Sequence, residues 1–397
     1  MNLKRKQTVI KYINRAFIAL VGLILTAGLV RTVFFPQELN EHENRYAYRI
    51  KKPAFSDYLD GSFQKSVSDA LNDQIHLSAL AKKCYNRATA EFAKPLISCL
   101  SRQCDDYIHF RGGILYRDML LYQPYDVSAA REKLAKRIEH DNAFISAYPD
   151  LDFYIYYIEK DTDIDFTTGE KLDAYQQLKE GLALPDGHIA HFAVDSFETF
   201  RKYFYRTDHH WNFRGSYLGY KQVISMLSEE APLTPLRQVD TPYVFSGSKA
   251  YSMGADGVYT DAMSVYEFPF TPMTITCDGG NPVEDYGAVD ALLAGTLAPV
   301  TYGTVYGWDG GEVVFDTNRP ERENLLVIGE SYDNAIMKLL ASHFNKTYGI
   351  DLRYYENAFG DVFDFSAYIA ENHVRKVLLI GNIDYFIAPV FEIGGSG

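Results

Sequence analysis

The sequence is poor in cysteine, tryptophan and basic residues. Its 397 residues include four cysteines and two tryptophans, and there is no C-x-x-C motif and no internal repeat. A cysteine-based metal centre and a repeat architecture are therefore not indicated. Lysine and arginine together number 39 against 52 aspartates and glutamates, which gives a formal charge of −13. This balance argues against a nucleic-acid partner, because phosphate binding needs a concentrated basic surface.

The cysteines leave their own pairing open. They are Cys84, Cys99, Cys104 and Cys277. Cys99 and Cys104 close a short loop and are suitably spaced for a disulfide in an oxidising compartment, but spacing alone does not fix pairing. Buried or paired thiols are the simpler interpretation, and we expect no metal and no other cofactor.

The first 35 residues differ from the rest in charge and hydropathy. They hold six basic residues and no acid, and an apolar run extends over residues 16–35. A helix needs about 20 residues to cross the hydrocarbon core. We therefore expect a single transmembrane anchor at 16–35, with 1–15 in the cytoplasm and the remainder outside the cell membrane. A cleaved signal peptide is the alternative, although no A-x-A site follows Val30.

Beyond the anchor, the pattern changes near residue 105. Residues 36–104 are polar and helix-prone, and we interpret them as a helical connector. Three apolar runs of strand length follow, at 153–158, 325–329 and 377–381, and helical patterns at 128–147, 334–344 and 365–375 alternate with them. This alternation predicts an α/β domain over 105–397 with a mostly parallel sheet flanked by helices. Residues 232–320, rich in Gly, Thr, Tyr and Pro, are expected to form an irregular or β-rich insertion over the sheet's edge.

Two segments carry residues suited to nucleophilic catalysis. Ser331 follows the 325–329 strand directly and precedes a helical pattern, the position at which ligands bind in open α/β sheets. Backbone N–H groups at the start of a helix can stabilise an oxyanion formed when the hydroxyl attacks a carbonyl. Asp208 and His210 are two apart, so in an extended segment they project to the same side. Asp208 can then orient His210, and His210 can accept the proton of Ser331.

Each segment also has a structural interpretation. A serine after a strand is often a helix N-cap beside a turn glycine. Adjacent histidines are often hydrogen-bonded loop residues. A zinc site on His209 and His210 is not favoured, because adjacent residues of an extended strand point to opposite sides.

The two segments together resemble a known family. TDHHWNFRGSYLGY (207–220) and LLVIGESYDNAIMKLL (325–340) are similar to the motifs of the DHHW-motif family and of the related alginate O-acetylation proteins AlgJ and AlgX. Glu43, Arg45, Pro53 and the pair at 60–61 fit the N-terminal pattern of that family. The resemblance implies an SGNH-hydrolase-like catalytic domain in which the Asp/His pair precedes the serine.

The resemblance also implies roles for single residues. It makes Ser331 the nucleophile, His210 the base and Asp208 the orienting acid. The supporting or oxyanion candidates are Gly329, Tyr332, Asn334 and His209. The aromatic residues themselves, apart from the resemblance, make Trp211 and Trp308 the substrate-binding candidates, although packing against the motif is the simpler interpretation of Trp211. Glu330 departs from the family pattern, in which Asp or Thr is common.

The expected activity is O-acetylation of a cell-surface or secreted polysaccharide through an acyl-Ser331 intermediate. The resemblance implies a multi-span membrane-bound O-acyltransferase as acyl donor. A polysaccharide O-acetyl esterase of the same fold and a non-catalytic glycan-binding scaffold are the alternatives.

Overall fold

The computed structural model describes residues 106–284, 286–297 and 299–394, together with short stretches before residue 89, of which 15–23 and 62–74 are the longest. The chain divides into two compact units, Met1–Thr89 and Ala90–Gly397. Each unit is described by itself.

The first unit has little described structure. Residues 15–23 are helical and exposed. Strand β1 (Leu39–Asn40) pairs with β2 (Arg45–Tyr46), and helix α3 (Ser62–Gln74) follows. Among the residues described, no helix has the length and apolar character needed to span a membrane. Nine positions of the predicted anchor at 16–35, most of the connector at 36–104, and Cys99 and Cys104 lie outside the described residues, so these expectations stay predictions.

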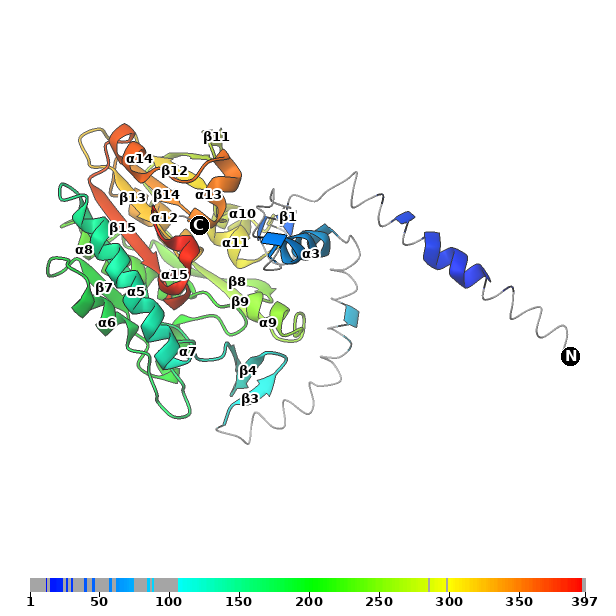
Figure 1. The fold of residues 1–397 in the computed structure, drawn as a ribbon. Coiled ribbons are helices and arrows are strands. Elements are labelled where there is room, and N and C mark those ends of the chain that lie inside the picture. The colour runs from blue at the N-terminus through cyan, green and yellow to red at the C-terminus, as the bar shows by residue number, and fades with distance from the viewer. Residues whose placement is uncertain are drawn as a thin grey trace, which may run out of the picture. The chain divides into compact units, whose positions relative to one another are not determined.

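The second unit is built on an eight-stranded mixed sheet in the order β11-β10-β12-β14-β13-β15-β6-β7 (Figure 1). The five strands from β14 to β7 are parallel, and β12, β10 and β11 continue the sheet in antiparallel pairing. The bounds are β6 Asp152–Ile158, β7 Ile189–Phe192, β10 Thr274–Cys277, β11 Asn281–Pro282, β12 Glu312–Asp316, β13 Leu325–Ile328, β14 Lys346–Ile350 and β15 Lys376–Gly381. The carboxyl ends of the parallel strands therefore meet at one edge.

The parallel strands are buried on both faces, which is why their sequences are continuously apolar. Tyr154 and Tyr156 of β6 pack into one hydrophobic core, whereas Phe153 and Ile155 pack into a second core on the opposite face. β13 and β15 divide their side chains in the same way. The three strands predicted from apolar runs are therefore confirmed, as neighbours in the order β13-β15-β6.

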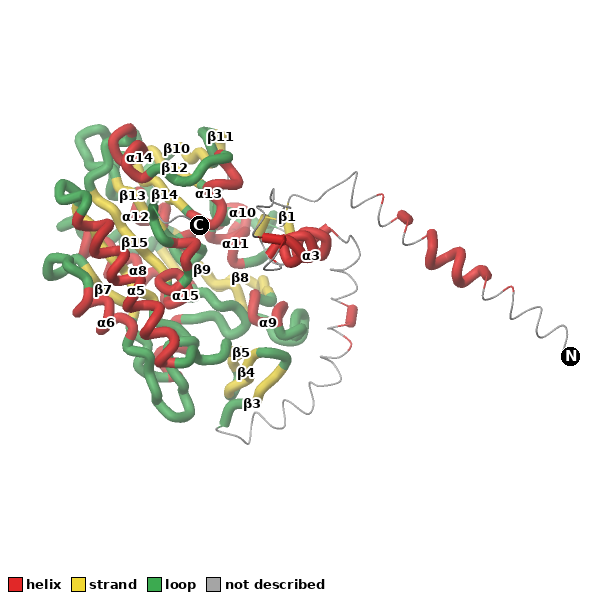
Figure 2. The backbone as a smooth tube through the Cα atoms, in the orientation of Figure 1, coloured by secondary structure: helices red, strands yellow, loops and turns green. Residues whose placement is uncertain are grey.

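Helices contribute to both cores (Figure 2). The first core receives α7 (Phe197–Tyr203), α8 (Phe213–Leu227) and α12 (Asn334–Ala341); the second receives α5 (Val127–Ser146), α6 (Ala174–Gly181), α13 (Leu352–Phe359), α14 (Phe365–Glu371) and α15 (Ile383–Ile387), with the short 3-10 helix η1 (Pro389–Phe391) beside it. The predicted helices at 128–147, 334–344 and 365–375 correspond to α5, α12 and α14. The mixed α/β architecture expected from the sequence is confirmed.

The segment 232–320 is not simply a cover over the sheet. β8 (Arg237–Phe245) and β9 (Asp261–Glu267) form a separate antiparallel pair, and the segment also holds α9 (Ser248–Ser252), α10 (Val289–Leu293) and α11 (Tyr302–Tyr306). β10, β11 and β12, however, extend the main sheet beyond β14. The expectation that this segment lies over the edge is wrong for these strands, because β12 buries alternate side chains and pairs with β14 along its length.

A small sheet stands at the start of the second unit. β3 (Ile108–Phe110), β4 (Gly113–Tyr116) and β5 (Met119–Leu121) form it. Leu115 and Leu120 pack with Ala250 and Met253 in a minor core. This contact ties α9, and the loop before it, to the rest of the domain.

Candidate active site

Ser331 lies in a tight turn at the carboxyl end of β13. The Asp333 N–H donates to the Glu330 carbonyl at 2.9 Å, which closes the turn. Among the described residues, the N–H groups of Ser331 and Tyr332 have no acceptor. A Cβ at Gly329 would lie 2.2 Å from the Asp333 carboxylate, so only glycine fits there. The turn thus presents a half-buried hydroxyl beside two free N–H groups, a combination suited to an oxyanion.

The segment that carries Asp208 and His210 is a short loop between α7 and α8. The Tyr205 N–H donates to the His210 carbonyl at 3.1 Å, and the Asn212 N–H donates to the Tyr203 carbonyl at 2.8 Å. Asn212 then caps α8 through its side-chain oxygen. The loop is therefore held closed at its base by both flanking helices.

Three side chains form a continuous line of hydrogen bonds. The Asp208 Oδ1 lies 2.6 Å from the His210 Nδ1, and the His210 Nε2 lies 2.7 Å from the Ser331 Oγ. Asp208 and His210 are buried, and 121 positions of chain separate His210 from Ser331. The fold thus brings together the three residues that the sequence analysis singled out, in the order acid, imidazole, hydroxyl.

Asp208 is fixed on its other side as well. Its Oδ2 accepts the Ser248 N–H at 2.8 Å, and its Oδ1 also accepts the His210 N–H at 3.0 Å. A Cβ on Gly247 would lie 2.2 Å from the Asp208 Cβ. Burial by itself raises the pKa of Asp208, but the charge and hydrogen bond of His210 outweigh it and hold that pKa well below its usual value. Asp208 therefore remains ionised and orients the imidazole.

Thr207 connects the loop to the β8–β9 pair. The Thr207 hydroxyl and N–H both donate to the Asp261 Oδ2, at 2.5 and 2.7 Å, and the Arg206 N–H donates to the Asp261 Oδ1 at 2.8 Å. The Gly247 N–H in turn donates to the Thr207 hydroxyl at 3.0 Å. Asp261 carries no local motif, so no sequence pattern pointed to it.

Aromatic rings enclose His210. Tyr302 of α11 stacks on its imidazole with a centroid distance of 3.8 Å and an interplanar angle of 2°. Trp211 is fully buried and packs against Gly219 of α8, where a Cβ would meet the indole at 2.5 Å. The structure therefore favours packing over substrate contact for Trp211, because its ring fills the space between the motif and α8.

His209 lies beside the line of hydrogen bonds. Its Nδ1 is 2.5 Å from the Ser248 Oγ, and its carbonyl accepts the hydroxyl of Tyr332. Burial and the adjacent His210 lower the pKa of His209 well below its usual value, so the ring is neutral. Tyr332 is fully buried, and its hydroxyl thus ties the serine turn to the histidine loop.

The sequence-based reason for disfavouring a metal at the two histidines was wrong. The rings of His209 and His210 lie on the same side, 3.8 Å apart, and one ligand atom each of Asp208, His209 and His210 lies within 4.8 Å of the others. Both nitrogens of His210, however, already face Asp208 and Ser331. A metal there would have to break the line of hydrogen bonds, and its absence remains a prediction.

Asn334 and Glu330 both point into hydrogen-bonded networks. The Asn334 Oδ1 accepts the Tyr286 hydroxyl at 2.6 Å, and its amide nitrogen donates to the Asp309 Oδ1 at 2.7 Å. Glu330 accepts the side-chain amide of Asn382, the residue after β15. Burial raises the pKa of Glu330. Glu330, which replaces the Asp or Thr common in the family, thus places an acid between β13 and β15. The side-chain amide of Asn334 is engaged in hydrogen bonds with Tyr286 and Asp309.

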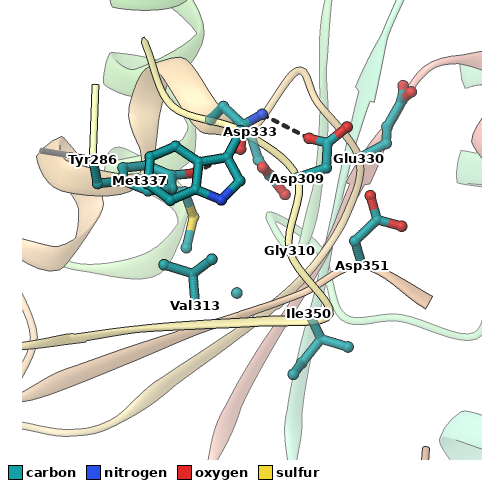
Figure 3. A pocket seen from close by; sticks show the side chains of 12 residues that line it. Tyr286, Asp309, Gly310, Val313, Glu330, Asp333, Met337, Ile350 and Asp351 are labelled. Atoms are coloured by element: carbon teal, nitrogen blue, oxygen red, sulfur yellow. Dashed lines mark hydrogen bonds between the residues drawn. The ribbon is translucent and has the colours of Figure 1, made fainter. Parts of the chain in front are cut away.

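A narrow pocket with about 20 Å³ of water-accessible space opens beside the serine turn (Figure 3). Glu330 and Asp333 line it from the turn, Asp351 lines it from the end of β14, and Trp308 and Asp309 line it from the loop before β12. Trp308 is half-buried and contacts Tyr286 at a centroid distance of 5.3 Å. The sequence analysis singled out Trp308 but not the acidic residues around it.

Sequence reasoning also missed a buried charged segment. Residues 159–163 (EKDTD) follow β6 directly and are all buried. The Lys249 Nζ lies 2.6 Å from the Asp161 Oδ2, and the Lys160 Nζ lies 2.7 Å from the Asp384 Oδ2. Four charges among five residues after an apolar strand were the available signal. These ion pairs surround the end of the sheet on which the site is built.

No protein-family model and no curated protein sequence matches the chain. Solved structures do match. A DHHW family protein from Eubacterium siraeum superposes with a TM-score of 0.54 and 16% identity, over 71% of this chain and 94% of that one. The present chain has the fold of a DHHW family protein. The sequence resemblance to that family is thus confirmed at the level of the fold.

Three further structures also match. PatB1 from Bacillus cereus matches with a TM-score of 0.53 and 17% identity, over 72% of this chain and 99% of that one, and a second PatB1 structure carries a sulfonyl adduct. The O-acetyltransferase domain of Pseudomonas putida AlgJ matches at 11% identity, over 70% of this chain and 91% of that one, with a TM-score of 0.34. That last score is too low to support an argument.

Proposed function

We propose that this protein is a membrane-anchored, extracytoplasmic serine O-acetyltransferase with an SGNH-hydrolase-like active site, which acetylates a hydroxyl of a cell-surface or secreted polysaccharide. The observation that carries the proposal is the line from Asp208 through His210 to Ser331, with hydrogen-bond distances of 2.6 and 2.7 Å. The DHHW fold and the sequence resemblance to the alginate O-acetylation proteins support it.

The reaction follows from the geometry in two half-reactions. The Ser331 Oγ attacks the acyl carbonyl while the His210 Nε2 accepts its proton, and the ionised Asp208 stabilises the imidazolium. The free N–H groups of the turn stabilise the oxyanion. The leaving group departs with the proton from His210, and Ser331 keeps the acetyl ester. A sugar hydroxyl then loses its proton to His210 and attacks the ester, and the proton returns to Ser331.

The expected partners follow from the predicted anchor. A span at 16–35 would hold the acidic catalytic domain against the outer face of the membrane. A multi-span O-acyltransferase in that membrane would supply the acetyl group, and the polysaccharide would be the acceptor. The acidity of the domain disfavours a strongly anionic polysaccharide, because like charges repel.

Covalent labelling of Ser331 tests the nucleophile. The full chain is incubated with a sulfonyl fluoride, and intact mass and peptide mapping are compared for wild type, Ser331→Ala and the exposed-site control Ser366→Ala. We expect one sulfonyl adduct on Ser331 in wild type and in the control, and none in Ser331→Ala. Adducts that persist in Ser331→Ala would refute the assignment.

The esterase alternative is separated by product analysis. The same site could pass the acetyl group to water instead of a sugar. With an activated acetyl ester and a polysaccharide acceptor, a transferase yields acetylated polysaccharide, whereas an esterase yields acetate at the same rate with and without acceptor. Absence of both labelling and turnover would indicate the non-catalytic scaffold.

A further inference from the structure

The pocket beside the serine turn has an imbalance of charge that the proposed chemistry does not use. Four carboxylates line it, from Asp309, Glu330, Asp333 and Asp351. One guanidinium, that of Arg353, lies 2.5 Å from the Asp351 carboxylate and 3.0 Å from that of Asp309. Glu330 accepts the amide of Asn382. Three of the four acids therefore have partners within the protein.

Asp333 is the exception. Its side chain accepts no hydrogen bond and forms no ion pair within the part of the chain that the structure describes. The residue is nevertheless buried, with a relative exposure of 9%. It lines the pocket together with Asp309, Glu330 and Asp351 (Figure 3). Burial and those three neighbouring charges raise the pKa of Asp333 well above its usual value. An unpaired buried carboxylate is costly and lacks a cationic partner.

The shape of the pocket limits what that partner can be. The enclosed space that a water molecule can reach within it is about 20 Å³, enough for an ammonium group but not for a sugar ring. Trp308 supplies a half-buried aromatic wall, which suits stacking on a sugar and attraction of an ammonium group. A compact metal site is not formed, since the convergent set of ligand atoms in the described residues is that of Asp208, His209 and His210.

We propose that this pocket is part of the acceptor subsite and takes the amine of a hexose unit, with the ammonium group on Asp333 inside the pocket and the sugar ring outside it, at Trp308. The identification as an acceptor subsite rests on the proposed function. Asp333 is two positions from Ser331, so their Cα atoms lie no more than about 7 Å apart. A sugar held by Asp333 therefore brings its hydroxyls, or those of the next unit, toward the acylated serine.

Binding is tested apart from catalysis. Calorimetry on the full-length Ser331→Ala protein compares a glucosamine oligosaccharide with its fully N-acetylated counterpart. We expect the amine form to bind about tenfold more tightly, because a charge-assisted hydrogen bond is stronger than a neutral one. The double variant Ser331→Ala/Asp333→Asn should lose this preference, whereas Ser331→Ala/Asp186→Asn, which changes an exposed acid, should keep it.

The other outcomes separate failure of the inference from failure of the proposed function. Equal affinity of the Ser331→Ala protein for the two oligosaccharides would overturn it, whether or not the Asp333 variant folds. Displacement of the amine oligosaccharide by calcium would favour a metal site instead. Failure of serine labelling with a retained amine preference would refute the acyl transfer and leave the binding pocket standing. Labelling of Ser331 without a preference for the amine oligosaccharide would support the acyl transfer and refute the binding pocket.

Discussion

Two groups of polar side chains lie at the carboxyl end of β13, and they differ in how fully they are paired. On one side of Ser331, every nitrogen and oxygen of the Asp208 and His210 side chains has a partner. On the other side, Asp333 is buried with no partner in the described structure. The first arrangement is complete without ligand, as a preorganised catalytic group should be. The second lacks the partner that the proposed ammonium group would supply.

Removing the charge of Asp208 should have the largest effect on the paired side. We expect Asp208→Asn to lower kcat for an activated acetyl ester on the order of 10⁴-fold, because the amide no longer favours the imidazole tautomer that accepts the serine proton. Steady-state kinetics beside Asp150→Asn, an exposed control, measure it. A loss no larger than that of the control would contradict the role of Asp208.

Crowding the same carboxylate tests whether its position matters as much as its charge. A Cβ at Gly247 would lie within 2.5 Å of both the Cα and the Oδ2 of Asp208. We expect Gly247→Ala to lower kcat/KM about 100-fold through displacement of Asp208, and to cost about 1–3 kcal/mol of unfolding free energy.

Gly169→Ala is the matched control for this crowding. Its φ is +76° and no atom lies within 4 Å of the added Cβ, so alanine adds backbone strain without contact. We expect it to cost about 1–2 kcal/mol with unchanged kcat/KM. Equal losses of activity in the two variants would show that general destabilisation, rather than the position of Asp208, explains the effect.

Removing the charge of the unpaired Asp333 should increase the stability of the protein. We expect Asp333→Asn to stabilise the free protein on the order of 1 kcal/mol at pH 8, because the substitution removes repulsion with neighbouring acids. Since the folded-state pKa of Asp333 is raised, its wild-type stability is highest below the usual value of 3.8 and falls as the pH rises. The gain from Asn should therefore grow between pH 4 and pH 8.

Chemical denaturation at several pH values measures this gain. Asp351 belongs to the same pocket, and burial raises its pKa to about 6, so part of the wild-type decline in stability should fall between pH 4 and pH 6. A destabilising Asp333→Asn at pH 8 would mean that the carboxylate has a partner in the protein, which would remove the basis for a cation-binding pocket.

The sequence predicted the paired group of Asp208 and His210 far better than the surroundings of the unpaired Asp333. The strands at 153–158, 325–329 and 377–381 followed from continuous apolar runs. The spacing of Asp208 and His210 and the position of Ser331 after a strand made them candidates, and the resemblance to the DHHW-motif family assigned their roles. These are local features, in which each residue's chemistry and its neighbours suffice. The position of Ser331 after a buried strand also anticipated the turn that exposes its backbone N–H groups.

The surroundings of both groups depend on contacts that no local pattern encodes. Tyr302 reaches His210 and Asp261 reaches Thr207 from a segment with few helical periods, and Asp309 and Asp351 meet Asp333 only through the pairing of β12 and β14. The packing of Trp211 depends on such a contact as well, since the small residues Gly215 and Gly219 of α8 leave room for its ring.

The most direct test of the account follows one acetyl group from Ser331 to a sugar. The full chain is loaded with an isotopically labelled acetyl group from an activated ester, freed of excess reagent, and mixed with the glucosamine oligosaccharide. We predict that the label leaves Ser331 in a single turnover and is recovered as a base-labile O-acetyl ester on the oligosaccharide. Recovery of the label solely as acetate, at a rate that the oligosaccharide does not change, would contradict the claim of acyl transfer.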